Sequence, residues 1–134
     1  MKKRATFLFI QPYLCAQETH TLEIVFDKDE YWWGGVVAFG KQMPYVKPLK
    51  EINLALESYN NQVVPLFVSN KGRYIWSDKP FKFEIQDGAI RIKSDFEKIE
   101  LQKSGTTLRD AYLTACKKYF PPSQTLPDPL FFTM

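Results

Sequence analysis

The sequence has very few of the residues from which most catalytic centres are built. Its 134 residues include a single histidine, His20. One histidine excludes a histidine-based metal site and a serine–histidine–aspartate triad. The glycines of Gly34-Gly35 and Gly40 do not have the spacing of a dinucleotide-binding or phosphate-binding loop. We therefore expect no catalytic residue, no metal site and no cofactor in this chain.

Carboxylates are present, but no pattern makes them a site. The segment Asp27-Lys28-Asp29-Glu30 suggests a metal loop at first sight. No further ligands follow it at loop spacing, so we interpret it as a solvated turn. Pairs such as Asp95 and Glu97 occur, but nothing in the sequence places two carboxylates across a substrate at the separation that glycosidases use.

The chain also lacks a long hydrophobic run. Residues 1–16 instead have the pattern of a signal peptide: basic residues at Lys2-Lys3-Arg4, a short apolar stretch, and a small residue, Ala16, before the expected cleavage. The stretch is too short to span a bilayer. A lipoprotein signal that uses Cys15 is the weaker alternative, because Leu14 is bulky where a small residue is usual. We expect a secreted or periplasmic protein.

An excess of positive charge is missing once that segment is removed. The formal charge is +3, from 18 basic and 15 acidic residues. Residues 1–16 contain three basic residues and no acidic one, which leaves 15 of each sign. A neutral domain gives no basic surface for nucleic acid or for an anionic membrane. Cys15 is removed as well, so Cys116 has no partner for an internal disulfide.

What the chain does contain is β-type sequence. Hydrophobic residues make up 45% and aromatic residues 16%, enough for the core of one domain. Two segments, 63–68 and 81–86, each lead through a turn into a partner segment, at 73–77 and 90–92. Further strands are expected at 21–26, 32–39, 52–56 (where a helix is the alternative) and 96–101. We predict a mainly β fold, an antiparallel β-sandwich over residues 17–104.

A helix and an apolar end are expected to follow, in residues 105–134. Thr107 and Asp110 resemble a capping box, and Pro121-Pro122 ends the helix. The expected apolar face consists of Leu108, Ala111, Tyr112, Ala115 and Tyr119. A proline-rich connector, 123–129, then leads to an extended apolar tail, 130–134. Such a tail is rarely left exposed, so we expect it to contact a further domain or a partner.

The most distinctive segment is Tyr31-Trp32-Trp33-Gly34-Gly35, which continues to Met43-Pro44-Tyr45. Tryptophan faces beside glycine backbone can form a platform that a sugar ring approaches closely. The same residues can form a bulged strand whose tryptophans fill the core. For the aromatic residues as a set we expect core packing first, an interface second and sugar stacking third.

Three segments resemble the N-terminal β-sandwich of glycoside hydrolase family 31. The segment 31–35 resembles the aromatic–glycine segment of that domain, and 61–74, with Pro65 and Gly72-Arg73-Tyr74, resembles its proline-centred strand and return. The segment 107–122 resembles the helix and linker that lead to the catalytic barrel. Many members also carry an Arg-Asp pair between the first two segments, and residues 36–60 contain none.

The resemblance implies a galactose-mutarotase-like sandwich that precedes a (β/α)8 barrel in one parent chain. Family members are mostly retaining α-glycosidases whose two catalytic aspartates lie on the barrel. This chain would then be a non-catalytic domain that supports the barrel and shapes the pocket for an α-linked oligosaccharide. Its candidate pocket residues are Trp32, Trp33, Met43 and Tyr45. Two alternatives are a free-standing carbohydrate-binding module and a purely structural interaction domain.

Overall fold

The computed structural model describes residues 18–122. The expected signal peptide, the connector 123–129 and the apolar tail 130–134 lie outside the described residues. The described elements are β1 (His20–Val25), β2 (Trp32–Val36), the 3-10 helix η1 (Val37–Gln42), β3 (Leu49–Asn53), β4 (Val63–Ser69), β5 (Arg73–Trp76), β6 (Lys82–Gln86), β7 (Ala89–Ser94), β8 (Leu101–Lys103) and α1 (Leu108–Tyr119).

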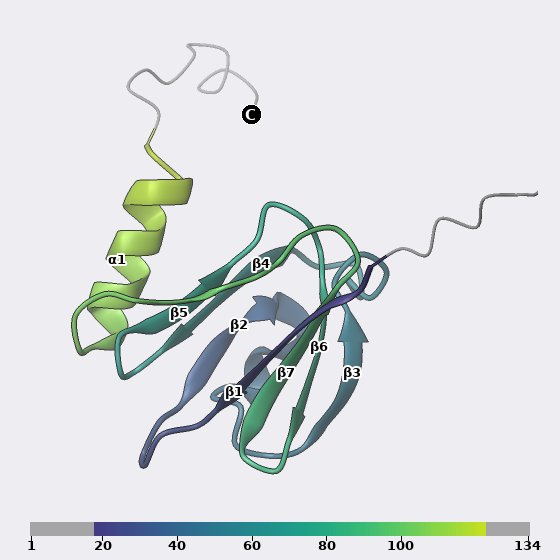
Figure 1. Ribbon diagram of the computed structural model, residues 1–134, viewed down its shortest axis with the longest axis horizontal. Coiled ribbons are helices and arrows are strands. Elements are labelled where there is room, and N and C mark those ends of the chain that lie inside the picture. Colours follow the sequence, from purple (N-terminus) through teal and green to yellow (C-terminus); the bar gives the residue numbers. More distant parts are fainter. Residues whose placement is uncertain (1–17, 123–134) are drawn as a thin grey trace, which may run out of the picture.

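The strands form two antiparallel sheets that face each other, with α1 on the outside of one of them (Figure 1). One sheet has the order β1-β7-β6-β3 and the other the order β2-β4-β5-β8. The predicted mainly β sandwich with one C-terminal helix is confirmed. No helix in the described part of the chain is long and apolar enough to cross a membrane.

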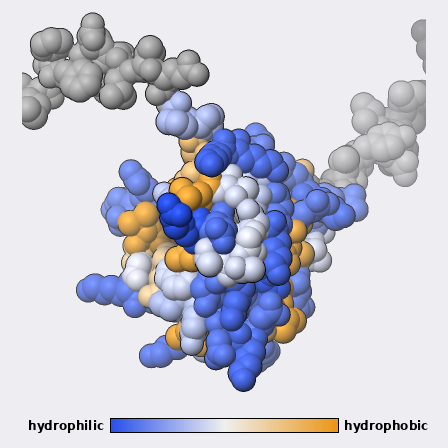
Figure 2. Space-filling model, turned by 90° about the vertical axis from the view of Figure 1, so that its left-hand side faces the viewer, coloured by the Kyte–Doolittle hydropathy of each residue, from blue (hydrophilic) through white to orange (hydrophobic). Residues whose placement is uncertain are grey.

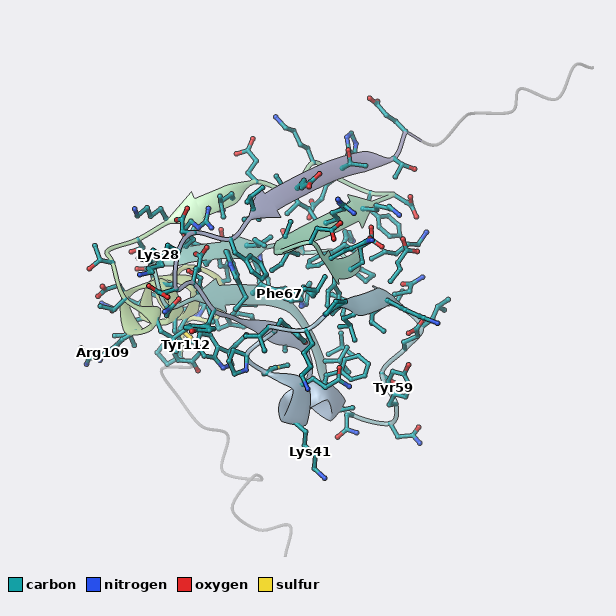
Figure 3. All side chains as sticks on the ribbon, turned by 90° about the horizontal axis from the view of Figure 1, so that it is seen from below. Lys28, Lys41, Tyr59, Phe67, Arg109 and Tyr112 are labelled. Atoms are coloured by element: carbon teal, nitrogen blue, oxygen red, sulfur yellow. The ribbon has the colours of Figure 1, made fainter. Side chains whose placement is uncertain are left out.

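Strand periodicity explains how the layers assemble. Successive side chains of a strand point to opposite faces, so Phe67 of β4 and Ile75 of β5 enter the space between the sheets. Phe67 contacts Phe83 of the opposite sheet edge-to-face, with ring centroids 4.8 Å apart. Figure 3 shows Phe67 near the middle of the molecule, with Lys41 and Tyr59 at its periphery.

The outer face of the β1-β7-β6-β3 sheet is different, because it carries charges. Glu23 of β1 and Glu84 of β6 flank Arg91 of β7, and Lys93 Nζ lies 2.6 Å from Glu51. These ion pairs are exposed and contribute little to stability. They leave this sheet with one apolar face only, so it needs cover on one side only.

Three strands differ from the sequence predictions by three residues or more at one or both ends, in two cases because the partner strand ends. The strand expected at 32–39 ends at Val36, which pairs with Val63, the first residue of β4; residues 37–42 form η1. The strand expected at 52–56 is β3, which ends at Asn53 opposite Lys82, the first residue of β6. The last expected strand, 96–101, is found at 101–103, where it pairs with β5.

A bulge between Gly34 and Gly35 shifts the register of β2 against β4, and the two strands lie very close together there. Gly34 has φ +139°, and a Cβ at this position would overlap the carbonyl oxygen of Leu66. The bulged strand that the sequence suggested is therefore confirmed, and Trp32 fills the core beside it. The bulge is held from the other side by Tyr45, whose hydroxyl donates a hydrogen bond to the Gly34 carbonyl at 2.8 Å.

Helix α1 begins at the predicted capping box. Asp110 N donates to Thr107 Oγ1 at 3.2 Å, and the Asp110 carboxylate accepts from the Thr107 amide at 3.1 Å. Ala111 and Ala115 are buried against Val68 and Tyr74. Small alanine side chains let the helix lie close to the outer face of β4 and β5.

The acidic turn contains one residue that the sequence interpretation placed wrongly. Asp27 to Asp29 are exposed, as expected of a solvated turn, but the Glu30 side chain is 0% exposed. Arg73 forms a two-point ion pair with it, and Ser69 Oγ donates to it at 2.6 Å. Arg73 also lies over the Trp32 ring, 5.6 Å from the centroid. The pair ties the turn before β2 to β4 and β5.

The environment of Glu30 favours its ionised form. Burial raises the pKa of this carboxyl, but hydrogen bonds from Arg73, Ser69 and the Asp27 amide, together with the charge of Arg73, lower it more. The net pKa lies below its usual value. A lowered folded-state pKa means that stability is present above the unfolded-state pKa and is lost as the pH falls through the folded-state pKa.

Glu30→Gln should reduce the free energy of unfolding at pH 7 by about 3 kcal/mol, because it leaves Arg73 without its buried counter-charge. The difference from the wild type should be full above about pH 4.3, the unfolded-state value, and should shrink below it. Urea unfolding at several pH values measures this. The control is Glu100→Gln, whose side chain is 69% exposed and should change stability by less than about 0.5 kcal/mol. A difference that is constant from pH 7 to pH 3 would contradict the role given to Glu30.

Gly34→Ala should cost about 3 kcal/mol of unfolding free energy, because the added methyl group meets backbone and the residue keeps a positive φ. The matched control is Gly40→Ala in η1, where a Cβ meets nothing within 4 Å. Chemical unfolding of both variants makes the comparison. Equal stability of the two would mean that β2 relaxes away from β4.

Candidate functional site

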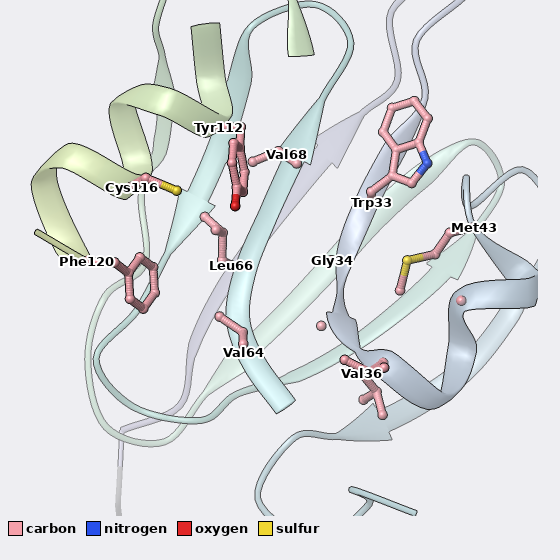
Figure 4. A pocket seen from close by; sticks show the side chains of 13 residues that line it. Trp33, Gly34, Val36, Met43, Val64, Leu66, Val68, Tyr112, Cys116 and Phe120 are labelled. Atoms are coloured by element: carbon pink, nitrogen blue, oxygen red, sulfur yellow. The ribbon is translucent and has the colours of Figure 1, made fainter. Parts of the chain in front are cut away.

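An apolar groove lies between α1 and β2, on the outer face of the β2-β4-β5-β8 sheet. We call it the α1 groove. Its volume is about 540 Å³. In Figure 4, Tyr112 and Cys116 of α1 form one wall together with Phe120, the residue that follows the helix; Val64, Leu66 and Val68 of β4 form the floor, and Trp33, Val36 and Met43 the other wall. Gly34, Gly35, Val37 and Gly40 complete the lining.

The groove exists because this sheet is apolar on both faces and α1 covers only part of the outer one. Helix α1 lies over β4 and β5. The outward side chains of β4 and β2, such as Leu66 and Trp33, are therefore left between the helix and η1. Figure 2 faces the side that carries α1 and shows hydrophobic patches on a largely hydrophilic surface.

The helix itself has more apolar surface than the sheet covers. Tyr112 belongs to the predicted apolar face but is 52% exposed, and Phe120 at the helix end is also exposed. Ala111 and Ala115 are the fully covered members of that face. The sequence correctly predicted an apolar face, but the described structure buries only part of it.

Contacts at its C-terminal end fix the position of α1. Tyr119 stacks on Trp76 with ring centroids 4.8 Å apart, and Phe120 meets Trp76 edge-on at 4.7 Å. Gln102 Nε2 donates to the Tyr119 hydroxyl at 3.0 Å, and the Tyr74 hydroxyl donates to Gln102 Oε1 at 2.7 Å. The helical wall of the groove is therefore held by aromatic and amide contacts at β5 and β8.

The lining has little polar chemistry. Among the described lining residues no side chain carries a carboxylate, amide, guanidinium or ammonium group. The polar atoms of lining side chains are the Trp33 indole nitrogen, the Tyr112 hydroxyl and the Cys116 thiol. The hydrogen bond with Cys116 raises the pKa of Tyr112 above its usual value. Within residues 18–122 no group of His, Cys, Asp and Glu is placed to hold a metal ion.

The four candidate pocket residues separate into two pairs. Trp32 is 0% exposed and Tyr45 is 1% exposed, so both rings lie in the core and offer no face to a ligand in this structure. Burial raises the pKa of the Tyr45 hydroxyl. Trp33 and Met43 lie in the wall of the α1 groove. The strand alternation of β2 explains the different places of the two tryptophans, because it turns Trp32 inward and Trp33 outward.

The loop that contains Met43 and Tyr45 borders a second hollow. This hollow has a volume of about 390 Å³ and is lined by residues 41–49, among them Lys41, Gln42 and Lys47. The backbone amide of Tyr45 donates to the Trp32 carbonyl at 3.0 Å, which ties the loop to the free edge of β2. Met43 is shared by the two hollows.

Sequence reasoning did not find the α1 groove as a site. A signal for it exists in residues 63–68, which are apolar at every position and so predict a strand with two apolar faces. The pattern does not reveal how much of the outer face the helix covers, since that depends on where α1 crosses the sheet.

Comparisons with known proteins add no assignment. No family model matches the chain, and no curated protein matches it at a significant level.

Proposed function

We propose that this chain is the non-catalytic N-terminal β-sandwich of a secreted retaining α-glycosidase similar to glycoside hydrolase family 31. In this role it supports the (β/α)8 barrel of the same parent chain and helps to shape the pocket for an α-linked oligosaccharide. The resemblance of three sequence segments supports the proposal, and so does their position in the fold.

The three segments belong to one structural unit. The aromatic–glycine segment forms β2, the proline-centred segment forms β4, its turn and β5, and the third segment forms α1. Of these elements, β2, β4 and α1 line the α1 groove. A resemblance spread along the sequence thus falls on one sheet and its helix, as expected if that unit has one task.

The observation that carries the proposal is the apolar lining of the groove. A sugar presents several hydroxyl groups, each of which loses hydrogen bonds to water on binding and needs a polar partner in return. The described lining residues offer the three weakly polar groups named above and no charged one. Such a surface is suited to packing against protein, and it favours an interface domain over a sugar site in the groove.

A carbohydrate-binding module is the second candidate, and the hollow at residues 41–49 is the observation that favours it. Gln42, Lys41 and Lys47 can donate hydrogen bonds there, and Trp33 and Met43 lie nearby on the wall of the α1 groove. A polar hollow beside an aromatic ring is a common arrangement for sugar binding. In this case the chain would bind oligosaccharides without a barrel.

Titration with oligosaccharides separates the two candidates. The purified chain should hydrolyse no aryl α-glycoside, and its tryptophan fluorescence should not change with malto- or xylo-oligosaccharides up to millimolar concentration. A saturable change that Trp33→Ala abolishes, with an unchanged melting temperature, would support the binding module instead. Trp76→Phe is the control for a change that arises elsewhere, since Trp76 stacks on Tyr119 outside the groove.

The parent chain provides the decisive test of the domain role. The reading frame beyond codon 134 should encode a (β/α)8 barrel with two catalytic aspartates. The enzyme that contains both parts should hydrolyse α-glycosides, and Trp33→Ser and Met43→Ser should lower its kcat/KM about tenfold or more, which is about 1.4 kcal/mol in transition-state binding. A parent chain without a barrel would sink the proposal.

A further inference from the structure

The α1 groove leaves apolar side chains open to water in the described part of the chain. Tyr112 of α1, Phe120 just after it and Val37 of η1 are all exposed at its rim. Exposed apolar patches with a defined shape are usually binding surfaces. We therefore expect the groove to bind an apolar segment of protein.

We propose that Leu130, Phe131 and Phe132 of the same chain occupy the α1 groove. This inference goes beyond the proposed function and concerns the same groove, but it is argued only from the lining of the groove and from residues of this sequence. In a parent glycosidase the same segment would lie in the groove before the chain enters the barrel.

The chain leaves α1 next to the groove. Helix α1 ends at Tyr119, and the next residue, Phe120, already lines the groove. The chain therefore leaves the helix at one end of the groove. Pro121-Pro122 prevents the helix from continuing, so that the following residues are free to change direction.

The connector after Phe120 is long enough to reach along the groove. Along the helix, the groove runs from Phe120 back to Tyr112, which is about 12 Å at the rise of an α-helix. Leu130 follows Phe120 by ten residues, which can span up to about 33 Å when extended. The connector is thus long enough to turn and to return along the groove, antiparallel to α1.

The C-terminal segment and the floor of the groove are both apolar. Residues 123–134 contain Leu126, Leu130, Phe131, Phe132 and Met134, with Asp128 as the one charged residue. The floor of the groove is formed by Val64, Leu66 and Val68. Leucine and phenylalanine gain by leaving water for such a surface and need no polar partner there. Both the segment and the groove lose exposed apolar area when they meet.

The segment is covalently linked to the domain that carries the groove. A segment tethered by a short connector has an effective concentration in the millimolar range at its site. Even modest affinity then fills the groove, whereas a second copy of the chain at micromolar concentration cannot compete at equal affinity. This distinguishes the chain's own segment from a partner molecule as the occupant.

Cys116 provides a probe inside the groove. In the 134-residue chain with Cys15→Ser, Cys116 is the only thiol, and its rate of alkylation by iodoacetamide reports its accessibility. The triple variant Leu130→Ser, Phe131→Ser, Phe132→Ser should raise that rate roughly tenfold, the factor expected if the effective concentration is about ten times the dissociation constant. The melting temperature of each variant verifies that the sandwich remains folded.

The matched control moves the thiol by one residue. Cys116→Ser with Lys117→Cys places it on the exposed side of the same helix, outside the groove lining. Alkylation there should not respond to the triple serine change. Equal rates at Cys116 with and without the serine changes would overturn the proposal, and so would an equal increase at both positions.

A second measurement identifies the source of the segment. Thr133→Cys in the Cys15→Ser chain should form an intramolecular cross-link to Cys116 with a short bismaleimide, at a rate that does not depend on protein concentration. After correction for intrinsic thiol reactivity, the link to Cys116 should form about tenfold faster than the link to a cysteine at 117. Cross-linked dimers whose yield rises with concentration would overturn the proposal in favour of a second copy of the chain.

Discussion

The structure depends on one constraint: the β2-β4-β5-β8 sheet is apolar on both faces. Phe67 and Ile75 fill the space between the sheets, while Leu66, Val68 and Tyr74 point to the other side. A sheet of this kind needs cover on both faces, and the second sheet provides it on one face only. Helix α1 covers part of the other face. The α1 groove is the part of that face which the described residues leave uncovered.

Two features keep that uncovered surface in a defined shape. The glycines of β2 bring it so close to β4 that no side chain fits between them, and Tyr45 holds the bulge through its hydroxyl group. At the other wall, Trp76 and Gln102 fix the end of α1. The groove is therefore bordered by backbone and aromatic contacts on both sides. A pre-formed surface of this type loses little conformational entropy when it binds.

Much of the fold could be predicted from local pattern. Alternation located most strands, the Asp87-Gly88 turn located a hairpin, and Thr107 with Asp110 located the start of α1. Strand ends could not be predicted, because β2 and β3 end where their partners begin, and pairing is a property of the whole sheet. For the same reason the sequence did not show that Glu30 is buried: its partner Arg73 is distant in the chain, and the two meet only when β2 and β5 are in place.

The site was harder to predict than the fold. Trp32 and Trp33 are neighbours of the same type, and periodicity places them on opposite faces without saying which face is the core. In the structure Trp32 fills the core and Trp33 lines the groove. The lining combines β2, η1, β4 and α1, so that no single segment of sequence carries its signature.

The position of β1 has a consequence for synthesis on the ribosome. Among the strands that the structure describes, β1 is made first, and its neighbour in the sheet is β7. Leu22 and Ile24 therefore lack their strand partner while the five described strands between β1 and β7 are translated, β2, β4 and β5 among them. A nascent-chain chaperone that recognises extended apolar segments has its opportunity during this interval, which closes when β7 emerges.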